Sequence, residues 1–393
     1  MSNIICLPNN TVDVVYMEII LHRGMSSETK HTLGFEHLIE HLIYQNTETY
    51  KHKLNDELLK RGIVFNGMTT DNYVKYWFYA NKDHTEFLID VIYDFMNVKK
   101  FSRASVNKEK QIVIEEISMD LDDPNYNLVY NHNKILFPNN SISAHTSEII
   151  SNTKKCTSTK LISNYKSTYS PNKCTLIVAG NFDKEYIELY AREYMRMGRK
   201  VKIPNIVLDT PKKKTIIKHV ESKDISKTYC ILSFYDKVHE NDYLIAEIVS
   251  DILKLLIMDI VRERLALIYG VKCQFDVLHN RTTLTIDFNT KQENFKKSLK
   301  KILHIVHTHK ISKKIMKTIT NKIKMKKTDL VGQYDLKTRA EFVSDRIVHN
   351  LPVIDIETYY DNLLAVTLED INIFREKYLD RSVLTYMSED ELI

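Results

Sequence analysis

The feature that most constrains this sequence is a pair of histidines flanking a glutamate, in the order His37-Leu38-Ile39-Glu40-His41. Residues four apart lie one above the other on an α-helix, so both imidazoles can reach a single ion. Glu40 lies three residues after His37, where its carboxylate can activate a water at that ion. The pattern predicts a metal-binding helix near the N-terminus, and the same five letters also fit a helix with an ordinary solvated face.

Two histidines leave a catalytic zinc site one protein ligand short, because such sites use three and keep the fourth position open. Residues 106–119 are predicted to form a second helix, on which Glu109 and Glu116 share a face. Glu115 points away from that face. We expect Glu116 as the third ligand, and Glu109 as a carboxylate that orients a ligand histidine through its other ring nitrogen. Ordinary surface acids in a chain that is 27% charged would show the same spacing.

Further residues follow in an order that resembles the pitrilysin/insulinase family of zinc metallopeptidases, also called inverzincins after the H-x-x-E-H helix. The nearest branch is that of the processing peptidases. The similarity covers most of the chain, although Gly67 stands where the family has an alanine and Glu36 where it has a small residue. The matching segments are Gly34, Gly62–Thr70, Asp123-Pro124, Leu136–Pro138, Tyr169–Pro171, Leu176–Asp183 and Arg262–Tyr269.

The resemblance implies a zinc metalloendopeptidase with one Zn²⁺ per chain, held by His37, His41 and Glu116. Glu40 would act as the general base toward the attacking water. The resemblance assigns Tyr269 to stabilise the oxyanion and Arg262 to hold the substrate backbone. Without the family, Tyr269 would be read as a half-buried strand residue.

An extended substrate peptide is expected to add to an edge strand formed by Asn66, Gly67, Met68 and Thr69. Binding of this kind reads main-chain shape more than sequence, so the expected substrates are unstructured peptides or protein precursors.

Members of this family close two two-domain halves like a clamshell around a chamber, and this chain supplies one half. The resemblance therefore implies a homodimer, or a heterodimer with a related chain, in which Arg262 and Tyr269 face the zinc of the partner. Two alternatives remain open. One is a catalytically silent scaffold of the same fold, and the other is a viral maturation protease with a narrow cleavage site.

The order of predicted elements indicates an α+β chain of two homologous domains, each with a mostly antiparallel sheet and helices packed to one side. We expect a zinc-binding domain over residues 1–200, a linker over 201–213 containing Pro204 and Pro211, and a catalytically degenerate copy over 214–393. The second half contains no H-x-x-E-H. The expected strands are Val12–Leu21, Ile63–Met68, Tyr73–Ala80, Cys174–Val178, Tyr229–Phe234, Val271–Val277, Thr282–Phe288 and Val383–Tyr386. The expected helices include Gly34–Tyr44, Asn55–Arg61, His84–Met96, one ending near Phe137, Leu161–Tyr169, Asp242–Leu265, Glu293–His307 and a long pair after it.

Cysteine usage and the absence of long apolar runs indicate the compartment in which the protein is expected to work. The five cysteines are scattered without C-x-x-C spacing, which indicates reduced thiols in a reducing compartment. No apolar run is long enough to span a bilayer and no presequence is evident, so we expect a cytoplasmic protein without a membrane partner. Eight glycines and many Asn, Lys and Ile suggest an A+T-rich genome, such as that of a large DNA virus or a protist, so the location could be a host cytoplasm or a virion.

Lysines cluster between Lys310 and Lys327, mostly on the solvated face of a predicted helix. A basic face attracts nucleic acid nonspecifically, but no aromatic residues are interleaved with these lysines. A nucleic-acid partner is therefore not expected, and a positive wall that receives acidic or unfolded peptides is the simpler interpretation.

Overall fold

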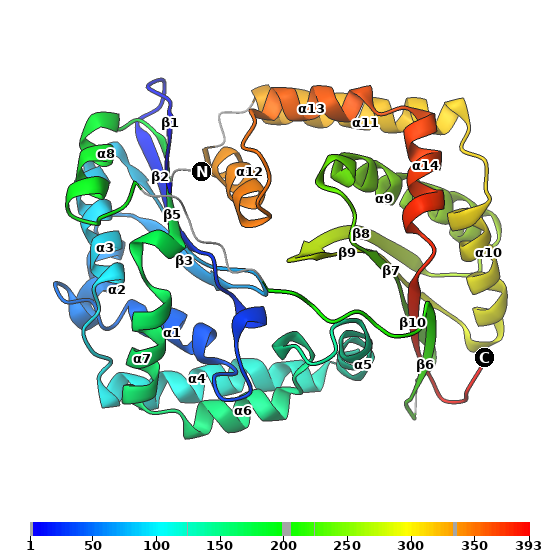
Figure 1. The fold of residues 1–393 in the computed structure, drawn as a ribbon, viewed down its shortest axis with the longest axis horizontal. Helices are drawn as coiled ribbons and strands as arrows, with labels where there is room; N and C mark the ends of the chain where they lie inside the picture. Colours follow the sequence, from blue (N-terminus) through cyan, green and yellow to red (C-terminus); the bar gives the residue numbers. More distant parts are fainter. Residues whose placement is uncertain (1–2, 124, 199–205, 224, 333–335) are drawn as a thin grey trace. The chain divides into compact units, whose positions relative to one another are not determined.

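The computed structural model describes residues 3–123, 125–198, 206–223, 225–332 and 336–393. They form two compact units, each built on one five-stranded sheet (Figure 1). The first unit comprises Met1–Asp122, Ala144–Ile206 and Asp335–Val353, and the second comprises Asp123–Ser143, Val207–Tyr334 and Ile354–Ile393. Two mostly antiparallel sheets with packed helices confirm the expected α+β class. Pro124 and residues 201–205 of the expected linker, Pro204 among them, lie outside the described residues.

The sheet of the first unit has β3 at one edge. Its order is β1 (Ile4–Pro8), β5 (Cys174–Gly180), β2 (Val14–Leu21), β4 (Val74–Asn81) and β3 (Val64–Thr69). The β1–β5 pair is parallel and the other neighbours are antiparallel. Because β3 pairs with β4 alone among the described strands, one side of its backbone is left without a neighbouring strand.

Both faces of this sheet are buried where β2 crosses it, and β2 is accordingly apolar at successive positions. Val15, Met17 and Ile19 face the main core, while Tyr16 and Ile20 face a smaller one. The helices whose residues fill the main core are α1 (Phe35–Ile43), α2 (Leu54–Lys60), α3 (Thr85–Met96), α4 (Arg103–Asp122), α7 (Ser158–Thr168) and α8 (Lys184–Glu193). Helix α6 (Thr146–Lys155) packs against α4.

The second unit repeats the topology of the first, which confirms the predicted internal duplication. Its sheet runs β6 (Thr215–Glu221), β10 (Ser382–Ser388), β7 (Thr228–Asp236), β9 (Arg281–Thr290) and β8 (Gly270–Leu278). Again the first pair is parallel and the others antiparallel. Its helices are α9 (Tyr243–Ile257), α10 (Phe295–His307), α11 (Lys313–Gly332), α13 (Ile356–Ala365) and α14 (Leu368–Tyr378).

Each unit also receives one helix from the other half of the chain. Helix α5 (Tyr126–Leu136) belongs to the second unit, where buried His132 bonds to the hydroxyls of Ser233 (2.8 Å) and Thr385 (3.0 Å). Helix α12 (Leu336–Val348) belongs to the first unit and covers the smaller core, with the Ser344 hydroxyl donating to buried Glu18. We expected two uninterrupted domains, 1–200 and 214–393, whereas in the structure α5 belongs to the second unit and α12 to the first.

Other differences from the expected elements are local. The parallel strands β1 and β6 and helices α6, α8, α13 and α14 were not anticipated. The helix expected over Asp242–Leu265 ends at Ile257 and continues as a π-helical segment, Met258–Arg264. Within the described part of the chain, none of the helices combines the length and apolar character needed to cross a membrane.

Candidate metal centre

Helix α1 carries the two histidines and begins at a tightly constrained glycine. Gly34 precedes it with φ = 81°, and a Cβ there would lie 2.9 Å from atoms of Ile149 and Thr153. The buried Glu28 carboxylate accepts hydrogen bonds from the backbone N–H groups of Gly34 and Glu36, at 2.8 Å each. Acceptor oxygens at a helix N-terminus satisfy its free N–H groups. Glu28 thus fixes the first turn, one residue before His37.

The apolar positions of α1 decide which way the histidines point. Leu38, Ile39, Leu42 and Ile43 are fully buried in the main core. With this stripe facing inward, the side of α1 that carries His37, Glu40 and His41 lines a pocket of about 420 Å³. The pocket is lined by His37, Glu40, His41, Tyr44, Gln45, Asn55, Phe65, Asn66, Gly67, Glu109 and Glu116.

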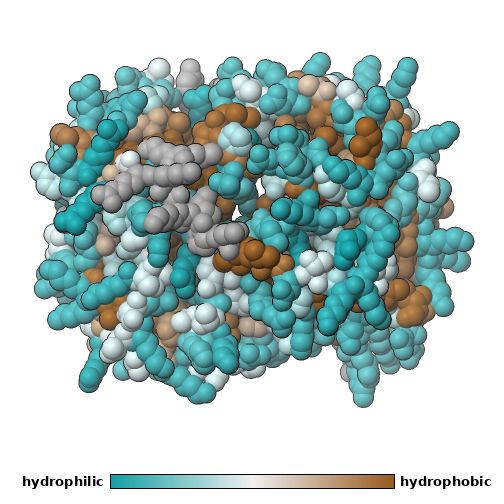
Figure 2. All heavy atoms as spheres, viewed as in Figure 1, coloured by the Kyte–Doolittle hydropathy of each residue, from teal (hydrophilic) through white to brown (hydrophobic). Residues whose placement is uncertain are grey.

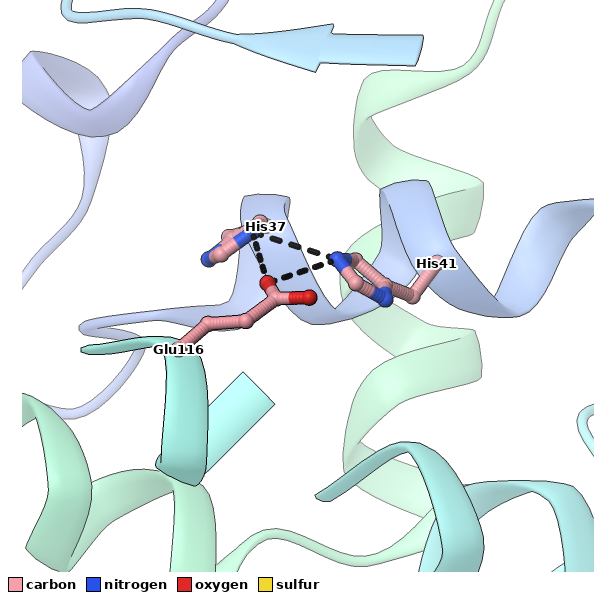
Figure 3. A group of neighbouring side chains, drawn as sticks. All are labelled: His37, His41 and Glu116. Atoms are coloured by element: carbon pink, nitrogen blue, oxygen red, sulfur yellow. Dashed lines mark hydrogen bonds and ion pairs between the residues drawn. The ribbon is translucent and has the colours of Figure 1, made fainter. Parts of the chain in front are cut away.

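Three side chains from α1 and α4 converge on one point (Figure 3). The Nε2 atoms of His37 and His41 are 3.3 Å apart. Oε2 of Glu116 lies 3.5 Å from Nε2 of His37 and 3.3 Å from Nε2 of His41. The structure therefore brings together the three residues that the sequence proposed as ligands.

This triangle fits a zinc ion. Ligand atoms at the corners of a tetrahedron around zinc, with bonds of about 2.0–2.1 Å, are separated by about 3.3–3.4 Å. The observed separations of 3.3, 3.3 and 3.5 Å are close to that value. Two imidazoles and one carboxylate are also the donor types that catalytic zinc uses.

Glu109 contacts the other nitrogen of His41, as its position on α4 predicted. Its Oε2 lies 3.3 Å from Nδ1 of His41, and its Oε1 accepts a hydrogen bond from the Gln45 amide. Only 5% of the Glu109 side chain is exposed. A carboxylate at Nδ1 favours the proton on that nitrogen and leaves the Nε2 lone pair free for a metal.

Burial also keeps His37 neutral. Loss of solvent, followed by the neighbouring His41, lowers the pKa of His37 to about 4. At neutral pH its imidazole therefore holds no extra proton, which is the form that binds metals.

Glu40 lies between the metal-binding face of α1 and strand β3. The Thr69 hydroxyl donates to its Oε2 at 3.2 Å, and a Cβ on Gly67 would lie 2.4 Å from its Oε1. Burial raises the pKa of Glu40, and this outweighs the opposing effects of His41 and Thr69. A carboxylate with a raised pKa is a stronger proton acceptor, as a general base requires.

The four residues expected on an edge strand lie on β3, which is an edge strand. Their side chains alternate between the two faces of the sheet. Gly67 and Thr69 face Glu40, whereas exposed Asn66 and Met68 occupy the alternate positions. Asn66 uses its Oδ1 to accept from the backbone N–H of Gly67 at 2.9 Å.

Arg262 and Tyr269 belong to the second unit, whereas the residues that line the pocket all come from the first. Arg262 lies in the π-helical segment and pairs with Glu263 at 3.0 Å. Tyr269, 45% exposed, directly precedes β8 and has the Lys227 ammonium 4.4 Å from its ring centre. Its backbone N–H donates to the carbonyl of Asn289 at 3.0 Å.

Sequence reasoning missed several residues around the centre. Gln45 lies in the turn directly after α1, four residues after His41, and extending the helical spacing by one turn could have found it as a partner of Glu109. Thr69 was expected on the substrate-binding strand, and the donation of its hydroxyl to Glu40 is a contact that the sequence did not reveal. Tyr44 and Asn55 line the pocket without any motif to reveal them.

Comparison with curated proteins finds relatives named as zinc proteases. An uncharacterized zinc protease of Bacillus subtilis, YmxG, is 27% identical over 190 residues, which cover 47% of this chain and 46% of that protein. An uncharacterized zinc protease of Rickettsia felis is 23% identical over 66% of this chain and 64% of its own length. The beta subunit of the mitochondrial-processing peptidase of Neurospora crassa is 22% identical over 44% of this chain and 36% of its own length. Each match covers less than two thirds of the relative.

Solved structures share the fold over nearly the whole chain. A protease from Helicobacter pylori matches with a TM-score of 0.85 and 14% identity, over 98% of this chain and 96% of that one. The periplasmic protease PqqL from Escherichia coli matches with a TM-score of 0.80 and 16% identity, over 98% of this chain but 46% of its own.

Two family models match the chain in succession. The model of insulinase, peptidase family M16, matches residues 4–147, which contain all the residues of the metal centre. The model described as the peptidase M16 inactive domain matches residues 155–324. With both models matched in this order, the chain belongs to the insulinase family of peptidases, family M16.

Proposed function

We propose that this protein is a zinc metalloendopeptidase that hydrolyses peptide bonds in unstructured peptides or protein precursors. The observation that carries the proposal is the triangle of His37, His41 and Glu116, with separations of 3.3–3.5 Å, beside the half-buried carboxylate of Glu40. A metal triad with an adjacent general base is the minimum that hydrolysis by activated water requires. The names of the relatives support the same reaction class.

In this proposal each residue has a defined role. His37, His41 and Glu116 hold the ion, and Glu109 keeps the proton on Nδ1 of His41. Zinc, when bound, would lower the pKa of water and polarise the peptide carbonyl. Glu40 accepts the proton from the attacking water and passes it to the leaving amine. Thr69 and the absence of a side chain at Gly67 set where the Glu40 carboxylate lies.

The substrate is proposed to bind as an added strand along β3. The free edge of β3 offers main-chain donors and acceptors, and Gly67 and Thr69 of the same strand contact Glu40. A peptide paired to that edge would therefore run close to the general base.

We further propose that two chains assemble, as a homodimer or with a related chain, so that Arg262 and Tyr269 act on substrate at the partner's metal. The match to 46% of PqqL supports this, because that protease is about twice as long as the part that this chain matches. An inactive Glu40→Gln chain mixed with an inactive Tyr269→Phe chain should recover part of the activity. If chains that demonstrably exchange recover none, the assembly proposal is wrong.

The principal experiment measures zinc content and turnover of a mixed pool of unstructured peptides by mass spectrometry. Wild type should bind zinc and cut, whereas Glu40→Gln should bind zinc without cutting. Glu116→Gln should lose zinc, and Glu115→Gln, which changes the exposed neighbour on the same helix, should behave as wild type. A wild type that binds no zinc would refute the proposal and leave the silent scaffold as the function.

If wild type binds zinc and cuts one structural protein but none of the peptide pool, the narrower alternative of a maturation protease applies. Copurification with assembling particles would then identify the substrate.

Five free cysteines among the described residues support our further proposal that the protein works in a reducing compartment such as the cytoplasm.

A further inference from the structure

Charge is unevenly distributed along this chain. Residues 291–328 contain thirteen lysines and one acid, Glu293, and so carry a formal net charge of +12. Because the whole chain carries +5, all other residues together carry −7. A positive segment on an otherwise acidic protein creates a local field that attracts anions to one region.

The structure displays these lysines on helices α10 and α11 of the second unit. Ile319 and Ile323 turn one side of α11 inward, and the helix packs against α13 and α9. Hydrophilic side chains predominate at the upper right of Figure 2, in the region where Figure 1 shows α10 and α11 together with α13 and α14. We call the exposed lysines of these helices the lysine face: Lys296, Lys297, Lys300, Lys313, Lys314, Lys317, Lys322, Lys324 and Lys326.

Most lysines of the lysine face on α11 form no ion pair within the described part of the chain. Among the described residues, Lys326 pairs with Asp251 at 3.9 Å, while the other five α11 lysines of the face form no ion pair. Lys313 and Lys317 are four residues apart, and Lys314 and Lys317 three apart, spacings at which like charges repel on a helix. An anionic partner would relieve that repulsion.

The chemistry of the face favours a polypeptide partner. Residues 291–328 contain no arginine, the residue that recognises phosphates with two parallel hydrogen bonds. Met325 is the only large apolar side chain exposed in this segment, so bases could stack only on the imidazoles of His304 and His307 and not on a Phe, Tyr or Trp ring. Because the apolar side of α11 is already buried, the helix cannot insert into a membrane.

The pocket at the metal centre has the opposite character. Glu40, Glu109 and Glu116 line it without any lysine or arginine, so with all three ionised the site keeps a formal charge of about −1 even when Zn²⁺ is bound, and it offers no cationic side chain to acidic residues next to the cleaved bond. Acidic residues of a substrate are therefore best accommodated away from the bond that is cut. The lysine face offers the complementary surface.

We propose that the lysine face binds an acidic segment of the polypeptide substrate, separate in sequence from the scissile bond. This inference rests on the proposed function, and it names a substrate class: unstructured polypeptides that carry a run of Asp or Glu. The contacts are between flexible ammonium groups and carboxylates, so binding depends on charge density more than on sequence.

The test measures binding without turnover. Zinc-loaded, full-length Glu40→Gln protein is titrated into a fluorescein-labelled peptide with a run of glutamates, or into its glutamine counterpart, and anisotropy is recorded. The acidic peptide should bind tighter, and its affinity should fall when salt rises from about 0.01 M to about 0.15 M. Adding Lys314→Glu, Lys317→Glu and Lys324→Glu should weaken acidic-peptide binding by about tenfold or more, with the glutamine peptide unaffected.

A matched control reverses three exposed lysines of the first unit, Lys155→Glu, Lys160→Glu and Lys166→Glu. It changes the net charge equally and should leave binding within about twofold. Equal losses in both triple variants would overturn the proposal, because the effect would then be one of net charge. Duplex DNA that binds the lysine face more tightly than the acidic peptide would also overturn it and assign the face to nucleic acid. Since the assay needs no catalysis, a failed peptidase assay does not affect its result.

Discussion

Replacement of Glu109 tests whether the centre is held in its metal-binding form by this chain's own contacts. Glu109→Ala removes the carboxylate at Nδ1 of His41, so His41 loses the group that fixes its ring and its tautomer. Loss of such outer partners typically weakens metal binding by about 10–100-fold. The size of the effect can be narrowed from the geometry.

The contact between Oε2 of Glu109 and Nδ1 of His41 is 3.3 Å, longer than the about 2.7–2.9 Å of a strong charge-assisted hydrogen bond. Solvent screening is weak, because only 5% of the Glu109 and 19% of the His41 side chain is exposed. We therefore expect a loss in the lower part of the range, about 10–30-fold in zinc affinity, or about 1.4–2 kcal/mol. Glu109→Gln keeps an acceptor for His41 and should lose less.

Zinc affinity is measured by competition with a chromophoric chelator at constant pH, and circular dichroism establishes that each variant is folded. Glu115→Ala, on the same helix but exposed, is the control and should bind zinc as wild type does. A folded Glu109→Ala protein with unchanged zinc affinity would refute the role given to Glu109. A loss of the same size in Glu115→Ala would show that α4 as a whole had been disturbed.

Three further predictions address stability, pH and the general base. Ala266 has φ = 49°, a left-handed conformation that costs a non-glycine residue about 1–2 kcal/mol. Ala266→Gly should therefore raise the free energy of unfolding, measured in thermal melts, by up to about 1 kcal/mol. An unchanged free energy of unfolding would mean that Ala266 is not strained. Burial lowers the pKa of His132 from 6.5 to about 4, so between these pH values the unfolded chain binds a proton that the folded chain does not. The free energy of unfolding should therefore decrease as the pH falls from 6.5 toward 4, by about 2 kcal/mol at pH 5. Urea titrations at pH 7 and 5 should show a smaller loss for His132→Gln than for wild type, and an equal loss would rule out His132 as the source. A methyl group at Gly67 would lie 2.4 Å from Oε1 of Glu40. Gly67→Ala should therefore displace the Glu40 carboxylate and lower kcat about tenfold at unchanged zinc content. An unchanged kcat would show that the position of the Glu40 carboxylate does not limit the reaction.

The metal centre could be predicted from the sequence because its constraints are local. Spacings of four within α1 and seven within α4 place His37, His41, Glu109 and Glu116 on two helix faces. Only the meeting of those faces had to be inferred, and the family resemblance supplied it. The repeated order of strands and helices likewise made the duplication visible before the sheets were seen.

The exchanged helices could not be predicted in the same way. The sequences of α5 and α12 do not determine which sheet each helix packs against, because both sheets present apolar faces. The decisive contacts join residues far apart in sequence, such as His132 with Thr385 and Ser344 with Glu18. Strand β1 was missed because five residues at a parallel edge, from Ile4 to Pro8, give too short a pattern to recognise.

The two units share one topology, and the residues on the open side of the helix that follows the second strand distinguish them. In the first unit α1 follows β2, and its buried stripe leaves His37, Glu40 and His41 on the side that lines the pocket. In the second unit α9 follows β7 and likewise buries one stripe, to which Ile248, Ile252 and Leu256 belong. The less buried side of α9 carries Glu247, Asp251 and Lys254, so it presents no imidazole to a metal ion. The two helices therefore bury comparable stripes, and the difference in metal chemistry follows from the residue types on their open sides rather than from how the helices pack.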